Sequence, residues 1–165
     1  MTKAVTKKDA PQDETLAMIE RIVTHEGADV EKLRAVLGMK KEHEADIAKR
    51  EYFSAMTRAQ SEMEAISQDA ANPQTRSRYA SYQALDRVMR PIYTKHGFSL
   101  AFNTGDSPTE AHVRVVLNIN HDSGHAEQLH IDVPVVTVGP QGKAVMTPTH
   151  ATISAVSYGR RTLLK

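Results

Sequence analysis

The sequence predicts an α+β fold, with N-terminal helices followed by a helix–β–β–β–helix core that contains an antiparallel sheet. In the first half of the chain, apolar residues recur at spacings of three and four, which is typical of amphipathic helices. After Gly97, three short runs alternate apolar and polar residues, which is typical of strands. Short polar turns join these runs, so we expect consecutive strands to pair as a meander.

Composition divides the chain into three parts. Residues 1–13 are polar, and we expect them to be disordered. Residues 14–72 carry the helical spacing and form a helical region. Residues 73–165 form the α+β core, and the turn signal Asn72-Pro73 marks the boundary between these two parts.

Two helices are expected in the second half of the helical region. A short one carries Val30 and Leu37 on one face, and Gly38 interrupts it. A longer one runs from Lys40 to about Ser67 with a narrow apolar stripe, which is nearer to a coiled-coil seam than to a core face. The pattern leaves two interpretations open: a contact between subunits, or packing on the chain's own core.

Local signals place the elements of the core. Ser81 is positioned to cap a helix that stops at Gly97. The three strands follow in the segments "FSLAFNTG", "HVRVVLNI" and "AEQLHIDVPVVTV". Thr147 is a suitable N-cap for a closing helix, with Pro148 at its first position.

Composition also excludes several classes of site. The chain of 165 residues has no cysteine, which rules out disulfides, thiolate metal sites and cysteine nucleophiles. No apolar stretch approaches the ~20 residues of a membrane span, and the first residues lack an apolar signal segment. We therefore expect a cytoplasmic protein with no membrane partner.

Charge is distributed unequally. Residues 1–75 carry 11 Lys and Arg against 14 Asp and Glu, whereas residues 76–165 carry 10 against 6, and seven of those ten cations are arginine. Arginine favours bidentate contacts to phosphate or carboxylate. Ordinary surface charge is the alternative interpretation.

The segment "VGPQGKAV" has some features of a phosphate-binding loop. Only two residues separate Gly139 from the Gly142-Lys143 pair, where a Walker loop needs four. A basic, flexible hairpin tip is the better interpretation.

Histidines near a predicted turn suggest a metal site. His121 and His125 belong to the turn "NHDSGH", and Asp132 lies on the strand that follows. A metal site needs three or four ligands that converge on one point. A metal-dependent nuclease using these three residues is our alternative function, weighed against a simple polar turn beside a solvent-facing strand.

The segment "QTRSRYASY" combines arginine with tyrosine. If it is extended, Arg76 and Arg78 point to the same side about 6.6 Å apart, with Tyr79 and Tyr82 alongside. Arginine for phosphate and tyrosine for base stacking are the components of a groove for single-stranded nucleic acid. A surface turn with inward-packed tyrosines is the alternative.

The closing helix contains two adjacent arginines with different environments. A helical wheel at about 100° per residue puts Arg160 on the apolar face, and puts Arg161 beside Tyr158 and Lys165 on a basic face. On that face Arg160 must extend its charge to solvent, pair with a carboxylate or cross an interface. The glycine before the two arginines would cancel this geometry if it ended the helix.

Taken together, these segments resemble the ERF (essential recombination function) family of phage single-strand annealing proteins. The resemblance covers about residues 45–165 and is carried, in order, by Ser77–Ala80, His96-Gly97, His121–Gly124 and Ser157–Leu163. One departure is Thr162, which stands where the family usually has an aromatic residue.

The resemblance implies a protein of phage-type homologous recombination that works in the cytoplasm of a bacterial host cell. Such a protein is not an enzyme, needs no ATP, metal or other cofactor, and forms oligomeric rings or filaments. It binds single-stranded DNA and anneals a complementary strand. Annealing requires that phosphates are neutralised while base edges stay free, and phosphate contacts position a strand without reading its sequence.

The residues and the resemblance together predict a basic DNA-binding groove with no catalytic residues. Its predicted members are Arg76, Arg78, Tyr79, Tyr82, Lys95, Lys143, Tyr158, Arg160, Arg161 and Lys165.

Overall fold

The computed structural model describes most of the chain: residues 17, 19–21, 24, 29–72, 76–139 and 142–165. Its helices and strands, in chain order, are α2 (Val30–Ser61), β1 (Ala70–Asn72), β2 (Ser77–Tyr79), α3 (Tyr82–Lys95), β3 (Phe98–Asp106), β4 (His112–His121), β5 (Ala126–Pro134) and α4 (Pro148–Leu163). The predicted α+β class is confirmed. The expected disorder of residues 1–13 lies outside the described residues. None of the described helices is both long and apolar enough to cross a membrane.

The chain forms two compact units, residues 1–46 and residues 47–165. In the first unit α2 begins at Val30, directly after Asp29, whose Oδ1 accepts a hydrogen bond from the Glu31 amide at 3.0 Å. The interruption predicted at Gly38 is wrong, because α2 runs through it. A single glycine costs a helix only about 1 kcal/mol, so its neighbours keep the helix intact.

The helix also ends earlier than expected, at Ser61 and not near Ser67. Its last turn tightens, because the Glu62 amide bonds the Ala59 carbonyl three residues back, and Ser61 Oγ donates to the Arg58 carbonyl at 2.7 Å. Bonds of this kind satisfy the carbonyls at a helix end and allow the chain to turn away.

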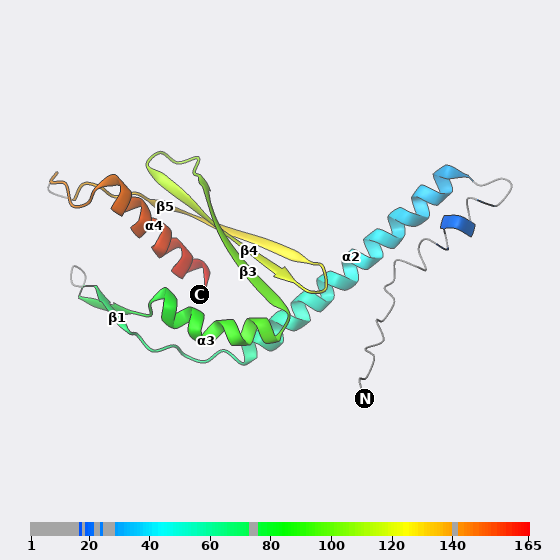
Figure 1. The fold of residues 1–165 in the computed structure, drawn as a ribbon, viewed down its shortest axis with the longest axis horizontal. Helices are drawn as coiled ribbons and strands as arrows, with labels where there is room; N and C mark the ends of the chain where they lie inside the picture. Colours follow the sequence, from blue (N-terminus) through cyan, green and yellow to red (C-terminus); the bar gives the residue numbers. More distant parts are fainter. Residues whose placement is uncertain (1–16, 18, 22–23, 25–28, 73–75, 140–141) are drawn as a thin grey trace, which may run out of the picture. The chain divides into compact units, whose positions relative to one another are not determined.

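The centre of the second unit is a three-stranded antiparallel sheet in the order β3-β4-β5 (Figure 1). The register pairs Phe102 with Leu117 and Val115 with Ile131. The predicted meander is therefore confirmed, including its two polar turns.

The two faces of this sheet differ in character. Side chains on one face, including Phe98, Leu100, Val115, Leu117 and Val133, pack beneath the C-terminal half of α2, α3 and α4. The opposite face carries mainly polar side chains, and no described helix packs on it: Ser99, Asn103, Asn118, Asn120, Gln128 and His130. The unit therefore has two layers, with helices on one side of the sheet (Figure 1).

Small residues seat α4 on the sheet. Ala151, Ala155 and Gly159 recur at every fourth position and are buried against β4 and β5. A Cβ atom added at Gly159 would lie 2.6 Å from Cγ2 of Val115, so only glycine allows this approach. As predicted, Thr147 caps the helix, and its hydroxyl accepts a hydrogen bond from the His150 amide.

The small-residue stripe corrects the helical wheel. Gly159 does not end α4, which continues to Leu163. The wheel was centred on Ile153, yet that side chain is 59% exposed, and Arg160 is also exposed. The error arose because the wheel assumed that the largest apolar side chains mark the buried face. In α4 the buried face is the one with small residues, which allow the helix to approach the sheet closely.

A second hairpin was not predicted. Strands β1 and β2 pair antiparallel, with Ala70 opposite Tyr79, although each has only three residues. Arg76 precedes β2 with a φ of 50°, a left-handed conformation. The extended alternation expected from Arg76 to Arg78 is therefore wrong, since the left-handed residue breaks it.

Candidate nucleic-acid interface

A stacked cluster of one arginine and two tyrosines forms where α4 meets the β1–β2 hairpin. The guanidinium carbon of Arg161 lies 4.1 Å from the ring centroid of Tyr79 and 5.2 Å from that of Tyr158. Arg161 and Tyr79 are partly buried, whereas the Tyr158 ring is 51% exposed. We call these three residues the stacked cluster.

The stacked cluster holds a cation without using up its hydrogen-bonding capacity. Contact with an aromatic face engages the plane of a guanidinium, and its five N–H groups point outward in that plane. The Arg161 side chain makes no hydrogen bond or ion pair to any other described residue. The group is therefore orientated and charged, with donors available for a phosphate.

A depression next to the stacked cluster contains two more predicted residues. Arg78, Tyr79 and Lys165 line a cavity of about 340 Å³ whose floor includes Leu85 and Met89. One guanidinium nitrogen of Arg78 donates to the Gln68 carbonyl at 3.0 Å, which fixes the side chain and leaves its other donors free. Glu64 is the acidic residue on the rim.

Arg160 stands beside a second pair of aromatic rings. Its guanidinium carbon lies 5.6 Å from the ring centroid of Phe102, and Phe102 meets Tyr82 edge-on at 5.8 Å. No carboxylate among the described residues pairs with Arg160. In this chain Arg160 is exposed and lies beside Phe102.

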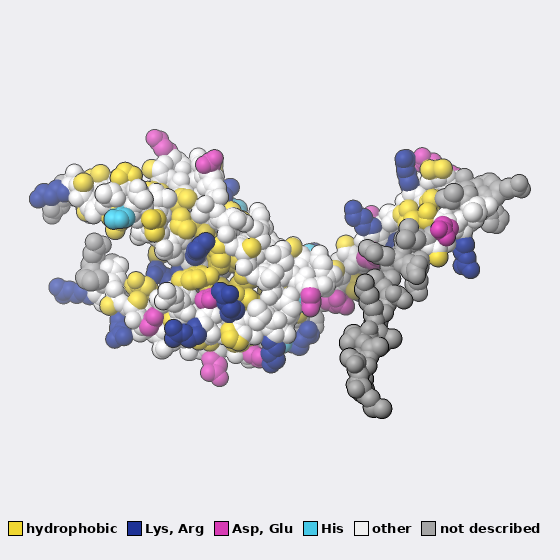
Figure 2. Space-filling model, viewed as in Figure 1, with side chains coloured by type: hydrophobic (Ala, Val, Ile, Leu, Met, Phe, Trp, Pro, Cys, Tyr) yellow, Lys and Arg dark blue, Asp and Glu magenta, His cyan; other side chains and the backbone are white. Residues whose placement is uncertain are grey.

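Figure 2 shows Lys and Arg side chains around a hydrophobic strip in the region of α3 and α4. The structure thus brings most of the predicted binding residues into one neighbourhood. Arg78, Tyr79 and Lys165 line one depression, and Arg161 contacts the rings of both Tyr79 and Tyr158. Separately, Arg160 contacts the ring of Phe102, which contacts the ring of Tyr82.

Three predicted residues do not join this neighbourhood by any described contact. Lys95 lies at the opposite end of α3, where its Nζ binds both carboxylate oxygens of Glu62 at 2.9 Å. Lys143 lies in the loop that precedes α4, and Arg76 lies just before β2. Contact between the predicted residues and DNA remains a prediction.

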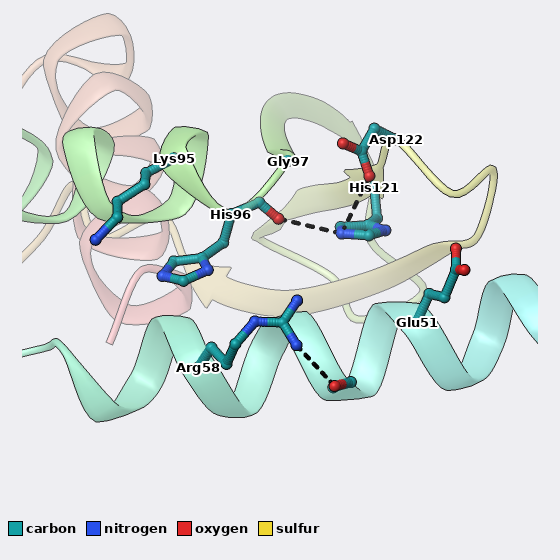
Figure 3. Close-up of a pocket in the computed structure, with 8 residues that line it drawn as sticks. Glu51, Arg58, Lys95, His96, Gly97, His121 and Asp122 are labelled. Carbon is teal, nitrogen blue, oxygen red and sulfur yellow. Dashed lines mark hydrogen bonds and ion pairs between the residues drawn. The ribbon is translucent and has the colours of Figure 1, made fainter.

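The turn "NHDSGH" is hydrogen-bonded to the segment after α3 and to α2, and Figure 3 shows two of its residues, His121 and Asp122. His121 Nε2 donates to the His96 carbonyl at 3.1 Å, and its Nδ1 lies 2.7 Å from Ser123 Oγ. Ser123 Oγ also donates to the Ala48 carbonyl on α2 at 2.9 Å. Because both ring nitrogens of His121 have partners, the histidine fastens the turn and is not an open metal ligand.

The third residue of the hypothetical metal site is elsewhere on the sheet. Asp132 lies opposite Arg114 in the β4–β5 register, and the two form a bidentate pair at 2.8 and 2.9 Å. Position 114 is seven residues from His121 along β4, or about 23 Å. The pair lowers the pKa of Asp132 to about 2, chiefly through the hydrogen bonds from Arg114.

The triad of His121, His125 and Asp132 is therefore not assembled. Among the described residues, no three His, Asp or Glu side chains are placed to hold a metal ion. The nuclease hypothesis required these three side chains to converge on one point, and they do not.

The four motif segments meet in two pairs. Tyr79 of the first contacts Arg161 of the last, and the two middle segments join through His96, Gly97 and His121. The Asp122 amide also donates to the Gly97 carbonyl, and a Cβ atom at Gly97 would lie 2.5 Å from the Asp122 carboxylate. The middle pair is structural, whereas the outer pair is open to a ligand.

The chain was compared with known proteins. A profile of the ERF superfamily matches residues 52–165, which includes all four segments. No curated protein and no solved structure matches the chain.

Proposed function

Because the chain belongs to the ERF superfamily, we propose that it binds single-stranded DNA across the stacked cluster and anneals a complementary strand to it. Membership supports a role in phage-type recombination through single-strand annealing. The particular surface, the absence of enzymatic activity, the independence from ATP and the location in the cytoplasm of a bacterial host are parts of our proposal.

One observation carries the choice of surface. Arg161 is held against Tyr79 with its donors unused, and the exposed ring of Tyr158 lies beside it. A phosphate accepts hydrogen bonds from the edge of the guanidinium, while a neighbouring base stacks on the free tyrosine ring. Arg78 and Lys165 extend the positive charge along the same depression.

This chemistry suits annealing because it leaves base edges exposed. Contacts to phosphate and stacking on aromatic rings do not use the hydrogen-bonding edges that pair with a second strand. No bond is made or broken, so no catalytic group or ATP is required. The proposal therefore explains how the strand is ordered for pairing without naming a reactive residue.

A small site on each subunit gives low affinity by itself, so we also propose that subunits assemble into a ring or filament. Several linked sites raise the overall affinity for a long strand without any new contact. Tyr52, Ala55 and Ala59 of the α2 stripe pack in the chain's own core, so our candidate on this helix for the assembly is Phe53, which is 46% exposed.

The experiment compares fluorescent single-stranded oligonucleotide binding by the wild type, Arg161→Ala and a charge-matched control, Arg34→Ala. Arg34 is an exposed residue of α2 in the first unit and pairs only with Glu31, at 3.9 Å, among described residues. We expect Arg161→Ala to weaken binding about tenfold, equivalent to about 1.4 kcal/mol. The slope of log affinity against log salt concentration should fall by about one unit, which corresponds to the loss of one phosphate contact. Equal affinity and slope in the two variants would remove Arg161 from the interface.

Annealing is measured separately, by the rate at which two complementary labelled strands pair. Arg161→Ala should slow this reaction in the absence of ATP and magnesium, and Arg34→Ala should not. A wild-type protein that binds a single strand without accelerating pairing would contradict the annealing part of the proposal.

A further inference from the structure

The second unit contains an apolar groove beside the edge strand β5. It has a volume of about 310 Å³ and extends along the inner face of the sheet, bordered by Phe53 and Met56 from α2, by Met63 just after that helix and by Leu129 from β5. Phe53 and Leu129 are each 46% exposed at its rim. We call this depression the β5 groove.

Polar groups at one end of the β5 groove lack partners. The hydroxyl of Tyr52 and Nε2 of His125 are buried and have no hydrogen-bond partner among the described residues. Glu127, which also lines the groove, lies 4.0 Å from Nε2 of His125. Buried polar groups are ordinarily satisfied, so these two atoms are able to take a further hydrogen-bond partner.

The outer edge of β5 is open as well. Along Ala126–Pro134 the backbone pairs with β4 on one side, and no other described backbone group bonds to this strand. An open edge accepts an incoming extended segment through its unpaired N–H and C=O groups. The groove and the edge together favour a segment that carries exposed apolar side chains.

The same chain carries such a segment, between β5 and α4. Four apolar side chains in this segment are 41–53% exposed: Val136, Val138, Val145 and Met146. Its backbone folds back on itself, with Val138 bridged to Ala144 and the Val145 amide bonded to the Thr137 carbonyl at 2.9 Å. Lys143 is exposed near its end and forms no described ion pair. We call residues 135–139 and 142–146 the arm.

The arm does not reach the β5 groove of its own chain. It follows the C-terminal end of β5, whereas the groove lies at Glu127 and Leu129 near the strand's beginning. It also precedes α4, whose far end, at Leu164, lines the groove. A helix of 16 residues separates the two ends by about 24 Å. Figure 1 shows the arm and the β4–β5 turn at opposite ends of the sheet.

We propose that the arm of one copy occupies the β5 groove of a second copy. Apolar side chains of the arm cover Phe53 and Leu129, and Lys143 pairs with Glu127 of the neighbouring copy. Because the two complementary surfaces differ, the contact is head-to-tail and repeats into a closed ring or a filament. This inference deepens the assembly step of the proposed function and rests on it.

The decisive experiment measures mass in solution for two variants, singly and mixed. Val145→Asp alters the arm at a half-exposed position, and Leu129→Asp alters the groove at another. Each alone should have the mass of one subunit, since neither can join a copy of itself. Their equimolar mixture should form a dimer and nothing larger, because only one intact arm and one intact groove remain. Assembly of either variant alone, or a mixture that stays monomeric, would overturn the proposal.

Val88→Asp is the matched control, since Val88 is 40% exposed on α3 and belongs to neither surface. This variant should assemble like the wild type. The charges provide a second test at exposed positions, in which Lys143→Glu and Glu127→Lys each weaken association at least tenfold. The double variant should recover most of the loss, and a double variant as weak as the singles would contradict the Lys143–Glu127 pair.

DNA binding separates this inference from the proposed function. A short oligonucleotide that spans one subunit should bind Val145→Asp as well as wild type, whereas Arg161→Ala should still assemble. Normal binding of that oligonucleotide with unaltered assembly of Val145→Asp would refute the arm contact alone. A wild-type protein that is monomeric with and without single-stranded DNA would also refute it.

Discussion

Replacing Gly159 with alanine tests whether α4 is seated on the sheet as described. The added Cβ would lie 2.6 Å from Cγ2 and 2.9 Å from Cβ of Val115, a fully buried residue of β4. Val115 is β-branched and sits in a strand, so neither its side chain nor its backbone yields easily. The helix must therefore move away from the sheet.

The expected loss of stability follows from two opposing contributions. Overpacking of this severity costs about 2–3 kcal/mol, and alanine in place of glycine gains about 1 kcal/mol of helix propensity. The net loss is about 1–2 kcal/mol. At about 3 °C per kcal/mol for a chain of this size, the melting temperature should fall by about 3–6 °C.

Urea unfolding monitored by circular dichroism gives the free energy of unfolding directly. Gly38→Ala is the control, because a Cβ atom there meets nothing within 4 Å, and it should leave stability unchanged or slightly raised. Gly159→Ala should also weaken oligonucleotide binding, since a displaced α4 separates Arg161 from Tyr79. A Gly159→Ala protein as stable as the wild type would refute the seating of α4.

Three further predictions concern single side chains. Tyr79→Ala should weaken oligonucleotide binding about tenfold while Tyr79→Phe retains it, because the ring and not the hydroxyl contacts Arg161; equal losses in a fluorescence titration would argue against stacking. The pKa of Asp132 is lowered to about 2 from an unfolded value of about 3.9, so its pair with Arg114 stabilises the fold above about pH 4. That contribution disappears as the pH falls towards 2, and urea unfolding of Asp132→Asn should differ from wild type at pH 7 but converge with it near pH 2. Ser123→Ala removes the hydrogen bond to the Ala48 carbonyl, worth about 1 kcal/mol, and should speed hydrogen exchange in the C-terminal half of α2; unchanged exchange there would show that the bond contributes little.

Elements with local signals were predictable from the sequence. The meander was predictable because alternation and turn residues specify strand and hairpin together. The start of α4 was predictable from Thr147 and Pro148, since a capping hydroxyl and a proline at the first position act within one turn.

Features that depend on tertiary packing were not predictable in the same way. The β1–β2 hairpin has three residues per strand, too few for a periodic pattern, and a left-handed Arg76 lies at its turn. The buried face of α4 consists of Ala151, Ala155 and Gly159, which a search for large apolar residues does not find.

Some features of the candidate site were predictable from the sequence, and others were not. Arginine and tyrosine composition selected two segments that meet in the structure, but no local rule places Tyr79 against Arg161 across the length of the core. Phe102 was missed as a partner of Arg160, because on the sequence it reads as an ordinary core residue of a strand. The resemblance supplied what spacing could not, namely that the first and last segments belong together.

The hydrogen bond from Ser123 to the Ala48 carbonyl joins positions 75 residues apart in the chain. Contacts of such long range form late, because a large loop must close first. On the ribosome, α2 emerges well before the turn that fastens it, and until then Tyr52, Ala55 and Ala59 have no sheet to cover them. The order of synthesis therefore leaves the apolar stripe of α2 exposed until the strands that cover it have emerged.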